Sequence, residues 1–396
     1  TLTANIADLN LELGDLLKIQ PELAQNQYLD SLSKHPFTGH LKARGNLRKV
    51  DDLSTEIQWG ADTHLVAKGS IENLTQTDSL FYNLNNISFI SNKTAIDKLI
   101  SSKELGISIP KTIVAEGSLS GGTSWVKPNM ALKIPEGNAS INALVDFGEI
   151  MKFDGTVSID SLQLGQLLQS DQLGEISLQI NANGSGNETS NLDANITGNI
   201  SQFQYGGYSY KAIDIDGILN NGKGNISANI NDPNLNMDAG ATLLLTSNDN
   251  DIQFTSNIIG ADLKELGLTK ENIKVAANIN GGYTGTPSNF TINTVIDDGI
   301  AVADNEQYQV STIILKAHVE DTITDVSVQS NFLNGQLASN ASPNRITNAL
   351  KKQLEHYFST DDTVYEVEDT IEAKLAIAII PTPVLSKVFF NGVEDL

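Results

Sequence analysis

"TKENIKVAANINGGYTG", residues 269–285, shows the pattern that decides the fold. Within it Ile273, Val275, Ala277 and Ile279 recur at every second position, with Lys, Ala and Asn between them. Side chains alternate between the two faces of a strand, so a period of two puts the aliphatic residues on one face. The stretch predicts a strand with one apolar face and one polar face, ending in a glycine-rich turn.

The same alternation recurs along most of the chain, for example at 41–47, 113–119, 176–182, 226–230 and 252–258. Turn-forming stretches such as "NNGKGN" and "SNDND" separate these segments. Hydrophobic residues make up 40% of the chain and aromatic residues only 6%, a balance that suits many strands and turns. We therefore expect a mostly β fold: an elongated antiparallel sheet, U-shaped in section, with short helices between groups of strands.

Helical periodicity, with apolar residues three and four apart, is confined to short islands. "LELGDLLKI" at 11–19 returns as "LQLGQLLQS" at 162–170, and each copy precedes a strand pattern. We predict one continuous β segment over 1–396, with approximate repeat units starting near 11, 96, 162 and 262. The chain opens "TLTANIADLN", without a starting Met or an export signal, so we expect an internal fragment of a longer protein. The predicted helical islands are 12–34, 94–105, 164–173, 261–269 and 342–358.

Charge and cysteine content exclude several classes of function. The formal net charge is −23 and the pI about 4.4, so nucleic acid is not an expected partner. No Lys/Arg cluster is present to hold an anionic membrane surface. The absence of cysteine removes disulfides and thiolate sites, which suits an oxidising compartment. Residues 374–390 are the most apolar stretch, but prolines interrupt it and it is too short to span a bilayer.

No residue pattern predicts catalysis, so we expect no enzyme, metal or cofactor. The five histidines are scattered, and none has a second ligand three or four residues away on a helix. "GILNNGKG" at 217–224 resembles a phosphate loop, but Gly224 stands where Ser or Thr is required, so a hairpin turn is predicted. The acidic pairs at 297–298 and 361–362 are predicted to be turn residues.

An oxygen-rich stretch at 232–238 also falls short of a metal site. Its alternate residues Asp232, Asn234, Asn236 and Asp238 are predicted to share one side of a strand. A calcium loop of the EF-hand type would need Glu where Leu243 stands. A solvated outer face is therefore the prediction for this stretch.

The apolar faces of the predicted strands must be covered by something other than water. In a sandwich they would meet a second sheet about 10 Å away. In an incompletely closed sheet they would instead line a trough that needs an apolar guest, and strands of eight to ten residues reach about 25–30 Å, the scale of an acyl chain. The residues predicted to line this trough are Leu41, Ile113, Leu178, Ile180, Ile226, Leu243, Phe254, Ile273, Val275 and Ile292.

Several stretches carry a resemblance to a known family. "FYNLNNISFIS" (81–91), "IPKTIVAEGSLSGG" (109–122), "VQSNFLNGQLASNASPNRITNALKKQLEHYF" (328–358) and the repeated L-x-L-G-x-L-L helix resemble the TamB family in its Bacteroidetes-type form. TamB is the translocation and assembly module subunit of the AsmA-like superfamily, which is similar to the chorein group of bridge-like lipid transfer proteins.

The resemblance implies a periplasmic protein of a Gram-negative bacterium with a β-taco fold. It would be anchored in the inner membrane by a segment outside this chain and would end at a TamA-like outer-membrane barrel. The implied activity is movement of phospholipid between the two membranes, and also assistance to outer-membrane protein assembly. Asp-Ser-Leu triplets at 30–32, 78–80 and 160–162 resemble O-glycosylation sites of Bacteroidetes.

Three functions remain as expectations. The first is a passive lipid conduit, in which acyl chains slide along the apolar trough. The second is a periplasmic scaffold that presents strand edges to β-barrel precursors. The third is a surface adhesin or glycan-binding β protein, which the isolated Trp59 and Trp125 argue against because such proteins expose aromatic platforms.

Overall fold

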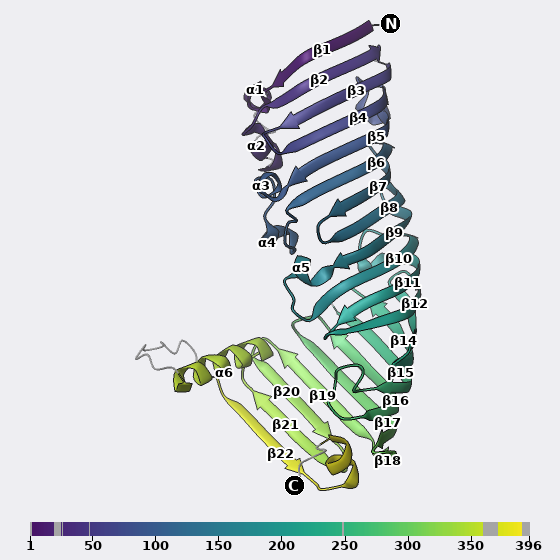
Figure 1. The fold of residues 1–396 in the computed structure, drawn as a ribbon, viewed down its shortest axis with the longest axis vertical. Coiled ribbons are helices and arrows are strands. Elements are labelled where there is room, and N and C mark those ends of the chain that lie inside the picture. The colour runs from purple at the N-terminus through teal and green to yellow at the C-terminus, as the bar shows by residue number, and fades with distance from the viewer. Residues whose placement is uncertain are drawn as a thin grey trace. The chain divides into compact units, whose positions relative to one another are not determined.

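Figure 1 shows the computed structural model of the chain as a ribbon. The structure describes residues 2–19, 25, 27–46, 48–247, 249–358 and 371–389. Its 22 strands belong to one sheet, their pairings are antiparallel, and the helices between them are short. The sheet is open and does not close into a barrel. The mostly β antiparallel prediction is confirmed, and the sandwich alternative is excluded because the described residues form a single sheet.

The chain divides into two compact units. The first comprises Thr1–Asn187 with Ala194–Ala212, and the second comprises Glu188–Asp193 with Ile213–Leu396. Strands β11 (Asp193–Tyr205) and β12 (Tyr208–Asn220) contribute residues to both units.

In unit 1 each strand from β1 to β10 pairs with the next one along the chain. Neighbouring antiparallel strands need only a turn between them, and the longer connections after β1, β5 and β9 carry the helices. The strands are β1 Leu2–Leu11, β2 Phe37–Gly45, β3 Lys49–Trp59, β4 Thr63–Glu72, β5 Phe81–Asn92, β6 Thr112–Gly122, β7 Trp125–Ile134, β8 Gly137–Asp146, β9 Lys152–Gln163 and β10 Leu173–Ser185.

In unit 2 the strands from β12 to β17 also pair in chain order. β17 then pairs with β18 along its last residues and with β19 along its first ones, and β19 to β22 follow in order. The strands are β13 Lys223–Asp232, β14 Leu235–Leu245, β15 Asn250–Asp262, β16 Ile273–Gly285, β17 Phe290–Ala303, β18 Glu306–Val310, β19 Ile313–Glu320, β20 Ile323–Gln329, β21 Leu333–Ser339 and β22 Ala373–Ile379.

The helices of unit 1 follow one another along the same ends of its strands (Figure 1). They bury single apolar residues there, among them Ala95 and Leu167. Ser101 and Glu104 cap one of these helices reciprocally, and Gly106 ends it with a φ of 69°. The helices are α1 Leu13–Ile19, α2 Gln27–Ser33, α3 Lys93–Ile96, α4 Ser102–Leu105 and α5 Leu164–Leu168, with the 3-10 turn η2 Thr77–Ser79.

Unit 2 contains α6 Pro343–Phe358, the 3-10 turn η3 Thr189–Asn191 and a short π-helical turn, η4 Leu385–Phe389. The predicted islands at 12–34, 94–105, 164–173 and 342–358 each contain helix. The prediction of a helix at 261–269 is wrong. There Leu263 N donates to Ile273 O across the connection, and Gly267 has a φ of 74°, so the chain reverses in a turn before a helix can form.

Three further local predictions have clear outcomes. The hairpin at 217–224 is confirmed, because Asn220 faces Lys223 across a two-residue turn with a φ of 50° at Asn221 and 71° at Gly222. The prediction of a glycine-rich turn after 269–280 is wrong, since β16 stays paired as far as Gly285. The prediction that the acidic pair at 297–298 forms a turn is also wrong. The pair lies inside β17, where Asp298 has a φ of 51° beside a register shift.

The oxygen-rich stretch at 232–238 does not share one face. The chain turns at residues 233–234, so Asp232 faces Leu235 on the apolar side, whereas Asp238 faces Asn229 on the polar side. Asp232 Oδ1 accepts from Asn234 N at 2.8 Å and closes the turn. The acidic pair at 361–362 lies outside the described residues.

Candidate functional site: the apolar face of each unit

The strand register brings the four predicted lining residues of unit 1 to one face of the sheet. Side chains of directly paired residues point to the same face. Leu41 pairs with Ile6 and Thr55, and Ile113 pairs with Ser91. Followed from strand to strand, the pairings reach Leu178 and Ile180, which oppose Ile159 and Val157.

The six predicted residues of unit 2 also share one face. Ile226 faces Gly217 on one side and Ala241 on the other. The remaining pairs continue this face across β14 to β17: Leu243 with Ile252, Phe254 with Gly281, Val275 with Ala301, and Ile292 with Tyr283. We call this surface, in either unit, the apolar face. The opposite face carries Asn, Ser, Thr, Asp and Lys at most positions.

Exposure shows that the apolar face is mostly uncovered. Eight of the ten predicted residues are half-buried, and Ile226 is 36% exposed. A second layer pressed onto these side chains would bury them almost completely, as in a sandwich core. The face therefore keeps apolar surface in contact with the surroundings, which is unfavourable in water by about 25 cal/mol per Å².

Ile273 is the exception among the ten. It lies on the apolar face, but its side chain is only 1% exposed because it belongs to a buried cluster with Ala301, Ala303 and Val388. Val388 lies in η4, so a distant segment covers this end of the face. Ile273 is therefore a core residue in this structure.

The apolar face continues over the last four strands of unit 2, beyond Ile292, the last of the predicted lining residues. Leu315 pairs with Val328, and Leu337 pairs with Leu375, on the same face as Ile292. Leu375 and Ile377 are 68% and 58% exposed. The alternation in "AKLAIAI" predicts a strand with one apolar face, but the pattern alone does not show that this strand continues the face of Ile292. Among the described residues, no helix has the length and apolarity needed to cross a bilayer.

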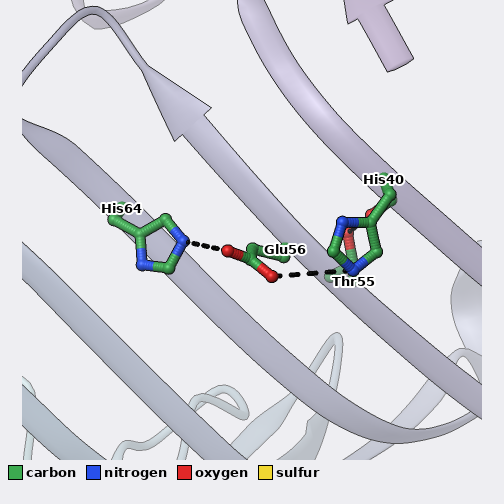
Figure 2. Close-up of polar contacts among 4 residues, drawn as sticks. All are labelled: His40, Thr55, Glu56 and His64. Carbon is green, nitrogen blue, oxygen red and sulfur yellow. Dashed lines mark hydrogen bonds and ion pairs between the residues drawn. The ribbon is translucent and has the colours of Figure 1, made fainter. Parts of the chain in front are cut away.

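On the polar face of unit 1, His40 and His64 lie on either side of one glutamate, as Figure 2 shows. Glu56 on β3 lies between His64 on β4 and His40 on β2. Its Oε1 is 2.7 Å from His64 Nε2, and its Oε2 is 3.6 Å from His40 Nε2. The carboxylate thus separates the two imidazoles, and the side chains are 37–47% exposed, so these pairs contribute little stability. Within the described ranges no group of three or more His, Asp or Glu side chains could hold a metal ion.

Among the described residues, each unit has an open hollow on the polar side of its strands. The first is lined by polar atoms around Asn86, Glu116 and Asn129. The second lies among Asp238, Asn278 and Asp297. Their linings are mainly polar, so neither suits a hydrocarbon chain. The apolar face, which is wide and open, is the better candidate for a functional surface.

Comparison with models of protein families, with curated proteins and with solved structures finds no match for this chain.

Proposed function

We propose that the chain is part of a bridge-like conduit that moves phospholipid between the inner and outer membranes of a Gram-negative envelope. Acyl chains slide along the apolar face while the headgroups stay in water, and no bond is made or broken. The resemblance to the TamB family supplies the periplasmic setting, the inner-membrane anchor and the TamA-like barrel as proposed partners.

The observation that carries the proposal is the continuity of the apolar face within each unit. In unit 1 it passes through every strand pairing from β1 to β10, and in unit 2 from β12 to β22. A strand such as β16, with 13 residues, is about 40 Å long, so the face is wide enough for acyl chains. Covering half-exposed Leu, Ile and Val with hydrocarbon removes both apolar surfaces from water.

Lipid carried through purification is the first test. We expect mass spectrometry of the purified chain to detect phospholipid that is absent from a mock purification. A photoreactive residue at Leu178 should then give lipid adducts, whereas the same residue at the adjacent Gln179, on the polar face, should give few. Equal labelling at the two positions would contradict the conduit.

A scaffold for β-barrel precursors is the second candidate, and β22 favours it. Among the described strands β22 pairs only with β21, and all seven of its residues are exposed. An unpaired strand edge can accept another strand through main-chain hydrogen bonds. Peptide adducts at Leu375, with none from lipid at Leu178, would favour the scaffold.

A further inference from the structure

The segment 382–388 lies on the apolar face of unit 2. Leu385 is 2% exposed and Val388 is 7% exposed, and Val384 packs against the same cluster. Val388 and Val384 pack against Ile273, Ala301 and Ala303, each 1% exposed or less. Aliphatic side chains of the segment therefore occupy the kind of surface that the rest of the face leaves open.

The attachment of this segment to the face is apolar. Leu385 N donates to Thr382 Oγ1 and Ser386 N to Thr382 O, so these hydrogen bonds stay within the segment. Ile380 N donates to Phe332 O at 2.9 Å and ties the chain to the sheet just before the segment begins. Removing the segment from the face would break apolar contacts and would leave these internal hydrogen bonds intact.

The surface beneath the segment has the chemistry of an acyl-chain site. Ala301 and Ala303 present only methyl groups, Ile273 and Val275 supply branched side chains, and Val310 on β18 extends the surface. Tyr308 on β18 also packs against this cluster, and its hydroxyl donates to Glu306 at 2.8 Å, a hydrogen bond that raises the pKa of Tyr308. The hydroxyl is therefore engaged by Glu306, and the residues that pack against the cluster are hydrophobic.

We propose that Ile273, Ala301 and Ala303 form an acyl-chain site that residues 382–388 fill when lipid is absent. An acyl chain and the segment make the same kind of apolar contact, so they compete for one surface. The segment acts as a displaceable cover that keeps this end of the face dry. This inference rests on the proposed conduit, because it names a site and a cover within it.

A reversible lock tests the competition. The chain has no cysteine, so Ala301→Cys with Val388→Cys introduces a single pair. With a photoreactive residue at Val275 and phospholipid vesicles as the donor, we expect the oxidised protein to lose most lipid adducts and the reduced protein to regain them. Adducts that are equal in the two states overturn the cover.

A second comparison keeps the test decisive if the pair does not oxidise. Val388→Gln weakens the apolar contact, whereas Lys387→Gln changes the exposed neighbour and is the matched control. We expect more lipid adducts at Val275 in the first variant and no change in the second. Unchanged or fewer adducts in Val388→Gln overturn the proposal. Loss of adducts at Leu178 in unit 1, in every variant, would instead reject the conduit itself.

Discussion

The apolar faces of the two units are built from the same alternating pattern but are covered differently. In unit 1 the helices stand along one set of strand ends, and Leu178 and Ile180 in mid-strand remain half-buried. In unit 2 η4 lies on the face and closes Ile273 off almost completely. The difference shows that alternation sets which side chains share a face, whereas a remote segment decides whether that face is open.

The largest expected effect is on stability at the covered end of unit 2. Ile273→Ala removes a fully buried side chain and leaves a cavity, so the free energy of unfolding should fall by about 3 kcal/mol. Ile226→Ala, on the same face but 36% exposed, should cost about 1 kcal/mol. Urea unfolding of the two variants measures the difference, and equal costs would mean that η4 does not cover Ile273 in solution.

A glycine of unit 1 gives the next effect. A Cβ at Gly117 would lie 2.1 Å from Asn129 O of the neighbouring strand, and its φ is 153°. Gly117→Val should therefore destabilise the protein by about 1–3 kcal/mol. Gly240 on the polar face of unit 2 is the control, because a Cβ there meets nothing closer than 3.7 Å. If Gly240→Val lowers the thermal midpoint as much, close strand approach at Gly117 is not the cause.

A charge on the open face of unit 1 should weaken lipid binding. Leu178→Lys places an ammonium group against hydrocarbon, and a cost of about 1.4 kcal/mol corresponds to a roughly tenfold loss of affinity. Gln179→Lys adds the same charge on the polar face and should leave binding unchanged. Titration with a fluorescent phospholipid measures both variants, and similar affinities would show that the face does not hold the acyl chain.

The smallest effect concerns a helix end in unit 1. Hydrogen bonds from the Ser101 hydroxyl and backbone N–H to Glu104 lower the pKa of the Glu104 carboxyl. A lowered pKa in the folded state stabilises the fold above the unfolded pKa, and this contribution is lost as the pH falls through the folded value. An NMR titration should place Glu104 below an ordinary Glu, and Ser101→Ala should return it toward that value. A Glu104 pKa that is unchanged by Ser101→Ala would contradict the reciprocal cap.

Short-range patterns predicted much of this architecture. The alternation around Val275 gave both the strand and the face on which the side chain lies, because side-chain direction depends only on position along a strand. The turn at Asn221 and Gly222 was equally predictable from residues that tolerate positive φ. No helix forms at 261–269, because a hydrogen bond joins Leu263 N to Ile273 O. Local periodicity does not predict a bond between residues ten positions apart.

The sequence by itself determined the strands, their polar and apolar faces, and most of the short helices between them, since each depends on neighbours a few positions apart. The tertiary structure alone decided that the faces belong to a single open sheet and that Val388 covers Ile273. Burial of a side chain depends on every segment that packs against it, including segments far away in the chain. Alternation within one strand does not predict which distant segment will pack there.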